Sequence, residues 1–347
     1  MAGGLRQSDV TTAGFRQFNA VPLDPSIRIF GPGATVAQDL EPEYIAVSDD
    51  STMAWVTLQE NNAIGVLDLR RREFTRLIGL GAKNHMLPGN GLDPSDRDGP
   101  NNSGAIRIGN WPVFGMYQPD SIAFVRVNGR GYLLTANEGD SRSSPRFNEE
   151  ARVSTLTLDP SLDQTLKSNA KLGRLVVTRT AGDPDRDGDY DFLAAFGARS
   201  FSVWTTEGAQ LYDSGDQFEQ ITAAAFPTRF NADHTDNSSA TFDSRSDNKG
   251  PEPEGLTVGT VNGRVYAFIG LERMSGVMVY ELANPIRFVQ YINPRNFGQP
   301  AGVNSGGDLG PEGVLFIRDV DSPTRQPLLV TTNEISGTTT IYAISSP

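Results

Sequence analysis

A proline followed by an acidic residue and then by a short apolar run occurs four times along this chain. The copies begin at Pro42, Pro119, Pro253 and Pro311, with the sequences PEYIAV, PDSIAF, PEGLTV and PEGVLF. Each copy leads into a polar turn, a second apolar strand, an acidic loop and a third strand. Repeated short strands joined by polar turns are typical of β-propeller blades, whereas a β-sandwich does not repeat the same loop chemistry. We therefore predict an all-β fold, a β-propeller.

The repeat also suggests how the chain is organised. A divergent segment at 191–215 (DFLAAFGARSFSVWTTEGAQLYDSG) is interpreted as a further unit, so about five blades are expected. Residues 1–30 are expected to be a linker or a closure strand, and residues 31–347 the propeller. Three long insertions interrupt it, at 82–116, 141–195 and 216–250. They look too polar to form core, and we expect them to carry function or to cap one face.

Charge narrows the classes of partner. The chain has 42 acidic and 30 basic residues, a net charge of −12, which disfavours nucleic acid and anionic membranes and favours bound cations. It contains no cysteine, which excludes disulfides and thiolate metal sites. No apolar run approaches the length of a membrane span. Residues 1–20 lack the apolar stretch of a signal peptide.

Acidic residues recur at both ends of the predicted strand pairs. In a propeller blade, the loop before the first strand and the loop after the second lie on the same face, so these acids should line one mouth of the central channel. We call the acids before the first strand leading acids and those after the second strand trailing acids. The leading acids are Glu43, Asp120, Glu254 and Glu312, and the trailing acids are Glu60, Glu138, Glu272 and Glu334.

Carboxylates this close together repel one another unless some are protonated or a cation lies among them. Oxygen ligands without cysteine favour Ca²⁺ first, and Mg²⁺ or another divalent ion second. The alternative is that the acids cap strand ends and accept hydrogen bonds from backbone amides.

The segment GDPDRDGDYDF places acids at alternate positions, with Gly188 in sixth place. This matches the first part of an EF-hand calcium loop, although the twelfth position is Ala194 instead of a glutamate. The alternative is a solvated acidic turn. The candidate ligands are Asp183, Asp185, Asp187, Asp189 and Asp191. A weaker version of the pattern occurs at Asp93, Asp96 and Asp98.

A few basic residues stand out near these acids. Cations beside a metal cluster would suit a phosphate or another oxyanion, but each could equally neutralise a neighbouring acid. The candidates are Arg199, Arg245, Lys249, Arg273 and His85. His85 and the second histidine, His234, both lie in insertions, where each is a candidate general acid or metal ligand or is simply solvated. The sequence has no phosphate-binding glycine loop, HExxH motif or Ser–His–Asp arrangement.

At these residues the chain resembles the choice-of-anchor I family. The stretches VTLQENNA, TANEGD, DSRSDNKGPEPEGL and AFIGLER carry the resemblance, which runs from about Phe30 to the C-terminus. The family includes proteins described as atypical alkaline phosphatases and mesenchyme-specific cell-surface glycoproteins associated with biomineralisation. The resemblance implies a β-propeller of seven or eight blades, of which the N-terminal ones would be absent here. It also implies a secreted, periplasmic or cell-surface location, and calcium.

Two functions follow from the resemblance and the residues. The first is a metal-dependent phosphomonoesterase acting on a small phosphorylated or other anionic ligand. The second is a non-catalytic calcium-binding protein of the cell surface or extracellular matrix. Asn101 and Asn237 begin glycosylation motifs that matter only in a eukaryotic secretory setting. For ring closure, residues 10–30 are expected to pair along TTTIYAI or to extend toward a missing propeller segment or an associated chain.

Overall fold

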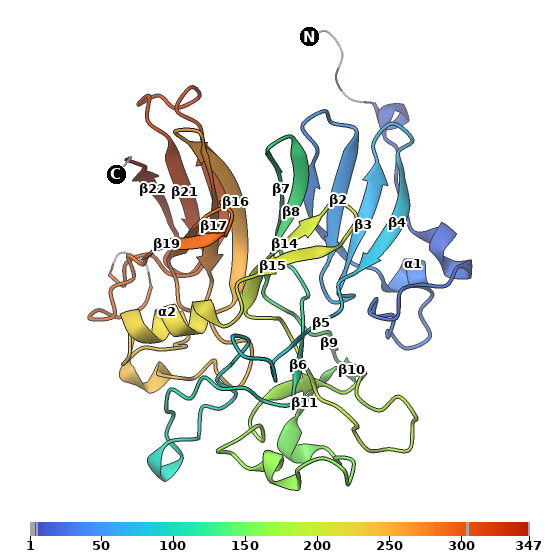
Figure 1. Cartoon of the computed structure of the whole chain (residues 1–347), viewed down its shortest axis with the longest axis vertical. Coiled ribbons are helices and arrows are strands. Elements are labelled where there is room, and N and C mark those ends of the chain that lie inside the picture. The colour runs from blue at the N-terminus through green and yellow to red at the C-terminus, as the bar shows by residue number, and fades with distance from the viewer. Residues whose placement is uncertain (1–3, 5, 303–304, 346–347) are drawn as a thin grey trace.

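The computed structural model describes residue 4 and residues 6–302 and 305–345. Four antiparallel sheets occupy the upper part of the molecule in Figure 1. The first blade consists of β1 (Pro42–Val47), β2 (Met53–Leu58), β3 (Ala63–Asp68) and β4 (Glu73–Gly79). The second consists of β7 (Ile122–Val127), β8 (Arg130–Asn137), β14 (Ser200–Thr205) and β15 (Gln210–Asp213).

The third blade consists of β16 (Pro253–Val261), β17 (Arg264–Leu271), β18 (Val277–Glu281) and β19 (Arg287–Ile292). The fourth has three strands, β20 (Pro311–Ile317), β21 (Leu328–Asn333) and β22 (Thr338–Ala343). The first strands contact one another in sequence, β1 with β7, β7 with β16 and β16 with β20. The prediction of an all-β propeller fold is therefore confirmed. The blades form an arc, with the first and fourth at its two ends (Figure 1).

The expected number of blades is different in the structure, because the segment 191–215 is not a separate unit. Its main strand, β14, pairs over its own full length with β8, from Ser200 opposite Asn137 to Thr205 opposite Tyr132. It therefore supplies the outer half of the second blade, together with β15. The insertion 141–195 lies between the second and third strands of that one blade, and the described part of the chain contains four blade sheets.

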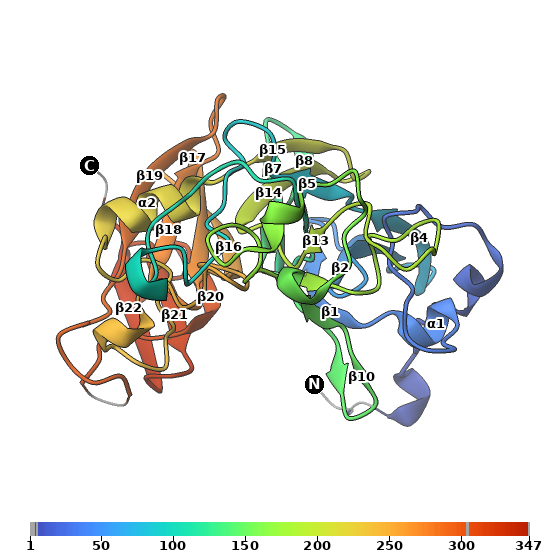
Figure 2. The same cartoon turned by 90° about the horizontal axis from the view of Figure 1, so that it is seen from below.

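Two of the insertions form a structure of their own beneath the blades (Figures 1 and 2). They share a sheet of order β11-β12-β13-β6-β5, in which β13 and β6 run parallel. Its strands are β5 (Ala82–Asn84), β6 (Phe114–Met116), β11 (Glu150–Arg152), β12 (Val176–Thr178) and β13 (Ala194–Ala195). A short hairpin, β9 (Ser143–Ser144) and β10 (Phe147–Asn148), lies beside it.

This sheet and the short turns around it enclose an apolar cluster. Its buried members include Leu172, Leu175 and Val177. The expectation that the insertions are too polar to form core is therefore wrong for 82–116 and 141–195. It is also wrong for 216–250, where Phe218 and Ala232 are buried in a core cluster with residues of the blades. The leucines and valines of the first two insertions are separated by polar turns, so their spacing in the sequence shows neither a strand period nor a helix period. The fold nevertheless packs them together in one cluster. The 3₁₀ helices here are η3 (Pro100–Asn102), η4 (Val153–Thr155) and η5 (Gln164–Lys167). The third insertion contains α2 (Gln217–Ala225) and η6 (Ser239–Thr241).

The N-terminal segment packs on the first blade and does not close the propeller. Residues 10–30 contain no strand, and the only regular element there is η2 (Arg16–Ala20); η1 (Gln7–Asp9) precedes it and α1 (Val36–Asp39) follows it. Phe15 stacks on Phe74 of β4, with ring centroids 4.2 Å apart. The expectation that this segment pairs along β22 is wrong, because its apolar side chains are buried against the first blade instead. Ile341 in β22 is left 64 % exposed.

Candidate metal-binding site

The local geometry of each first strand places its acid at the mouth of the channel. Pro42 pairs with Leu58, Pro253 with Leu271 and Pro311 with Asn333, and each pairing is followed by a shift of register. Such a bulge turns the residue after the proline out of the regular alternation of the strand. In the second blade, the backbone N–H of Asp120 instead donates to the carbonyl of Ala136, two residues before Glu138. The leading and trailing acids therefore lie at the same end of every blade.

Three of these acids come together at the junction of the second and third blades. Asp120, Glu138 and Glu254 each place one carboxylate oxygen within 4.8 Å of the other two. Burial, and next the charge of Glu138, raise the pKa of Asp120 to about 8 and that of Glu254 to about 10. The Oε2 atom of Glu254 is buried and has no hydrogen-bond partner among the described residues. A group of buried carboxylates with an unsatisfied oxygen is suited to binding a cation.

Glu138 is the centre of this group, and it already has one positive neighbour. The ammonium of Lys249 lies 2.5 Å from Oε1 of Glu138, and the amide of Gln59 donates to Oε2 over 3.0 Å. Lys249 also lies 3.2 Å from Glu252. Burial opposes the charged ammonium, but Glu138 and Glu252 together hold the pKa of Lys249 above its ordinary value. The single positive charge of Lys249 cannot neutralise the negative charge of all the carboxylates at this mouth.

Glu252 is the acid that the sequence analysis missed. Its side chain is fully buried, and it binds Arg245 over 2.5 Å, Arg273 over 3.1 Å and Lys249. Burial alone would raise its pKa, but the charges of Lys249, Arg245 and Arg273 hold it below the usual range for glutamate. The motif GPEPEG was the available signal, since it has a second acid directly before the proline, as the copy at Pro42 also does, whereas the copies at Pro119 and Pro311 do not.

The remaining acids extend the group in both directions. In the first blade Glu60 is buried, and its Oε2 has no hydrogen-bond partner in the part of the chain that the structure describes. Burial, followed by the charges of Glu41 and Asp140, raises the pKa of Glu60 to about 7. Glu43 is exposed and interacts with Glu60 and Glu138 through its charge. Glu312 is also exposed, and its negative charge helps to raise the pKa of Asp120 and of Glu254. The eight predicted acids therefore form a row of overlapping groups along the arc.

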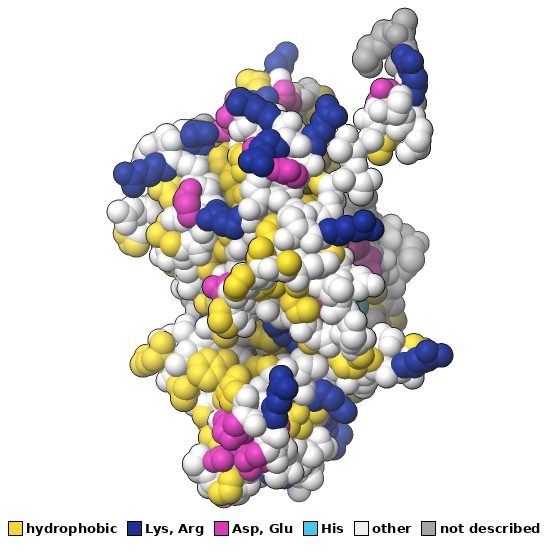
Figure 3. Space-filling view, turned by 90° about the vertical axis from the view of Figure 1, so that its right-hand side faces the viewer, with side chains coloured by type: hydrophobic (Ala, Val, Ile, Leu, Met, Phe, Trp, Pro, Cys, Tyr) yellow, Lys and Arg dark blue, Asp and Glu magenta, His cyan; other side chains and the backbone are white. Residues whose placement is uncertain are grey.

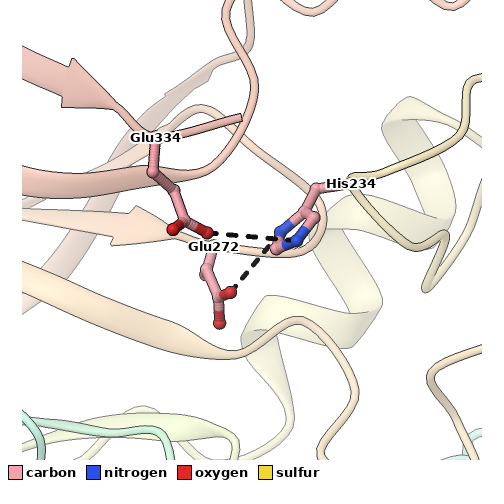
Figure 4. A group of neighbouring side chains, drawn as sticks. All are labelled: His234, Glu272 and Glu334. Atoms are coloured by element: carbon pink, nitrogen blue, oxygen red, sulfur yellow. Dashed lines mark ion pairs between the residues drawn. The ribbon is translucent and has the colours of Figure 1, made fainter. Parts of the chain in front are cut away.

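At the far end of the row, a histidine joins the carboxylates. His234, from the loop after α2, points toward Glu272 at the end of β17 and Glu334 at the end of β21 (Figure 4). One nitrogen of the imidazole and one oxygen of each carboxylate all lie within 4.8 Å of one another. Burial, and next the charge of Arg273, lower the pKa of His234 to about 4, so the ring is neutral at pH 7. Burial, and next the charge of Glu252, raise the pKa of Glu272 to about 9.

The acidic loop of the second insertion brings together only part of its predicted ligand set. Asp183, Asp185 and Asp191 place oxygens within 4.8 Å of one another, and Asp159 joins Asp189 and Asp191 in a second group. Asp187 instead accepts a hydrogen bond from the N–H of Asp189. Ala194, in the twelfth position of an EF-hand, belongs to β13 and offers no ligand. Acidic side chains gather at the lower end of the face in Figure 3, the end of the molecule where the insertions lie.

The weaker pattern at Asp93, Asp96 and Asp98 does not converge on one point. Asp96 binds the guanidinium of Arg174 over 2.7 Å, whereas Asp98 lies 3.4 Å from Arg107. Asp93 is fully buried, and burial, with the charge of Glu219, raises its pKa to about 8.

Comparison with known proteins places the chain in a family. The family model of the choice-of-anchor I domain matches residues 1–285. The chain belongs to the choice-of-anchor I domain family. It is 34 % identical over 192 residues to gigasin-3a of Magallana gigas, covering 52 % of this chain and 67 % of that protein. It is 27 % identical over 288 residues to the mesenchyme-specific cell surface glycoprotein of Strongylocentrotus purpuratus, covering 72 % of this chain but 36 % of the sea urchin protein.

Solved structures are more distant from this choice-of-anchor I chain. A putative 6-phosphogluconolactonase from Bacteroides uniformis aligns with 90 % of this chain and 55 % of its own, at 11 % identity and a TM-score of 0.37. The periplasmic gluconolactonase PpgL of Pseudomonas aeruginosa aligns with 95 % of this chain and 86 % of its own, at 12 % identity and a TM-score of 0.27. At these TM-scores neither structure bears on the activity of this chain. Among the described residues, no helix is long and apolar enough to cross a bilayer.

Two of the predicted oxyanion-binding residues lie elsewhere in this choice-of-anchor I chain. Arg199 is buried, where it binds Glu219 over 2.6 Å and donates to the carbonyls of Asp93, Ser246 and Asn248. His85 is buried as well, with Nδ1 2.6 Å from the carbonyl of Asn90.

Burial, and then the charge of Lys83, hold the pKa of His85 well below its ordinary value. The geometry gives no support to an oxyanion-binding role for Arg199 or His85, because both are buried among protein partners. The alternative reading, in which an arginine neutralises a neighbouring acid, describes Arg199.

Proposed function

We propose that this choice-of-anchor I chain is an extracellular calcium-binding β-propeller protein. The observation that carries the proposal is the group of Asp120, Glu138 and Glu254, with an oxygen of each within 4.8 Å of the others and an unsatisfied buried oxygen on Glu254. The sea urchin relative is named a cell surface glycoprotein, and this supports the extracellular location.

The spacing of these oxygens suits a large, hard cation. Ca²⁺ binds oxygen at about 2.3–2.6 Å, so two ligand atoms of one ion lie at most about 5 Å apart. Mg²⁺ binds at about 2.0–2.1 Å in a strict octahedron, so its ligand atoms must lie within about 4.2 Å of one another, a tighter requirement than that of Ca²⁺. The nearest positive group, Lys249, is directed at Glu138 and Glu252, which leaves Asp120 and Glu254 for the ion.

The acidic loop is proposed as a second calcium position. Its support is the convergence of Asp183, Asp185 and Asp191, together with a buried Oδ1 on Asp183 that has no hydrogen-bond partner within the described ranges. Because the loop belongs to the second insertion and not to the blades, calcium there would order the insertion without acting on the channel mouth.

Calorimetric titration of the chelator-treated full chain with Ca²⁺ tests both positions. Glu254→Gln should lower the Ca²⁺ affinity of the site at the mouth by about tenfold or more, so that its binding step is lost from the titration. Asp185→Asn should do the same to a different step, that of the loop. The matched control is Glu73→Gln, a surface glutamate paired with Arg71, which should bind as the unaltered chain does. Unchanged titrations for Glu254→Gln would refute the proposed site at the mouth.

Phosphomonoesterase activity is the other function that the family resemblance implies, and the geometry favours it less. Arg245, Lys249 and Arg273 each bind the carboxylate of Glu252, so none of the three is left to bind a phosphate alone. We therefore expect no hydrolysis of an aryl phosphate by the full chain, with Ca²⁺ or with chelator. Calcium-dependent turnover that disappears in Glu254→Gln would establish the phosphatase instead.

A further inference from the structure

The group of His234, Glu272 and Glu334 differs chemically from the rest of the carboxylate row. It contains the only imidazole in the candidate metal groups of the described residues. Nδ1 of His234 lies 3.4 Å from Glu272, and Nε2 lies 4.0 Å from Glu334. The three side chains come from three separate segments and converge on one point (Figure 4). His234 and Glu272 are nearly buried, whereas the side chain of Glu334 is 42 % exposed, so solvent reaches the group from one side.

The position between these side chains is already occupied by a cationic group of the protein. NH1 of Arg273 lies 2.7 Å from Nε2 of His234, and NH2 lies 3.2 Å from Oε1 of Glu272. A guanidinium can only donate, so Nε2 must present its lone pair to NH1. The two guanidinium nitrogens therefore stand where a metal ion would contact the imidazole and the carboxylate.

Arg273 can leave this position without losing all its partners. Nε of Arg273 binds Glu252 over 3.1 Å, and its side chain is 22 % exposed. An entering ion would replace the hydrogen bond to His234 while the arginine stays paired with Glu252. The guanidinium of Arg273 thus competes with a metal ion for this position but does not prevent the ion from binding.

We infer that His234, Glu272 and Glu334 form a second kind of metal site, one for a transition metal such as Zn²⁺ or Mn²⁺. Imidazole nitrogen is a good ligand for these ions and a poor one for Ca²⁺, which takes oxygen ligands. Three protein ligands with a solvent-facing side leave a coordination position open for water or a ligand, as in catalytic zinc sites. The inference goes beyond the proposed calcium binding and uses none of Asp120, Glu138 and Glu254.

Titration of the full chain with Co²⁺ in the presence of saturating Ca²⁺ tests the inference, since Co²⁺ reports its ligands in its visible absorption. The unaltered chain should bind one equivalent with a band that Zn²⁺ removes. His234→Ala should weaken Co²⁺ binding by about tenfold or more and abolish the band. Arg273→Gln, which removes the competing charge, should instead tighten the binding several-fold.

Two further variants keep the test decisive. Glu334→Gln changes a partly exposed side chain, so it should fold normally and still weaken Co²⁺ binding; it replaces His234→Ala if that variant does not fold. Glu73→Gln, at the surface glutamate paired with Arg71, is the control and should bind Co²⁺ as the unaltered chain does. Absence of Co²⁺ binding, or equal binding by Glu334→Gln, would overturn the inference. Glu254→Gln should keep the cobalt band, so a failure of the calcium proposal is distinguished from a failure here.

Discussion

Replacing Glu252 by alanine is expected to destabilise the protein by about 3–5 kcal/mol, because it leaves buried cations without their counter-charge. Glu252 is fully buried and holds Arg245, Lys249 and Arg273 together. Without it, Lys249 would keep only Glu138, and Arg245 would lose its one acidic partner among the described ion pairs. The measurement is the free energy of unfolding in denaturant.

A glutamate that is ion-paired at the surface provides the matched control. Glu73 pairs with Arg71, and its side chain is 47 % exposed. Glu73→Ala should cost less than about 1 kcal/mol, because an exposed ion pair contributes little. If Glu252→Ala cost no more than Glu73→Ala, the cluster would not depend on its central carboxylate.

The metal-free protein is expected to become less stable as the pH is raised from about 5 to about 9. The folded state raises the pKa of Asp120 to about 8, of Glu272 to about 9 and of Glu254 to about 10. Between their ordinary pKa values and these raised ones, the folded chain holds more protons than the unfolded chain. The contribution of these three carboxyl groups to the free energy of unfolding is therefore complete below about pH 4, and it is lost as the pH rises through their raised pKa values.

Thermal unfolding in chelator at about pH 5 and pH 9 measures this loss, which should lower Tm by about 5 °C or more. Calcium should reduce the difference in Tm between the two pH values, because a bound ion offsets the repulsion between the carboxylates at pH 9 as bound protons do at pH 5. The double variant Asp120→Asn with Glu254→Gln should flatten the pH dependence, since its side chains do not ionise. A Tm in chelator that is as high at pH 9 as at pH 5 would contradict this account.

The repeated motif predicted the fold and the direction of the acids because both depend on local sequence. A proline that starts a strand and an acid that follows it can be read from a few residues, and three of the four copies adopt the same bulge. The segment 191–215 was misread as a unit because strand and turn residues alone do not show which blade a strand joins. Its apolar run follows an acid, Asp191, but no proline precedes that acid, and the missing proline was the available warning.

The partners of the charged residues could not be predicted in the same way. Arg199 binds Glu219 of α2 and three carbonyls, and these contacts exist only once the insertions have folded beneath the blades. His234 likewise meets Glu334, a residue one hundred positions further along the chain. Sequence spacing gives no information about pairs formed at such separations, whereas it does for neighbours within a turn or hairpin.

The arc of blades also sets an order in which parts of the molecule can loosen. Each blade is held mainly by its neighbours, so the coupling between blades is of the nearest-neighbour kind found in repeat proteins. The fourth blade is attached chiefly through its strand β20, which contacts β16 and β17 of the third blade. Phe316 of β20 stacks there on Phe268 of β17, with ring centroids 5.8 Å apart. The second and third blades have neighbours on both sides, and Asp120, Glu138 and Glu254 span their junction. The carboxylate group thus lies in the part of the arc that should open last, while the outer blades fluctuate around it.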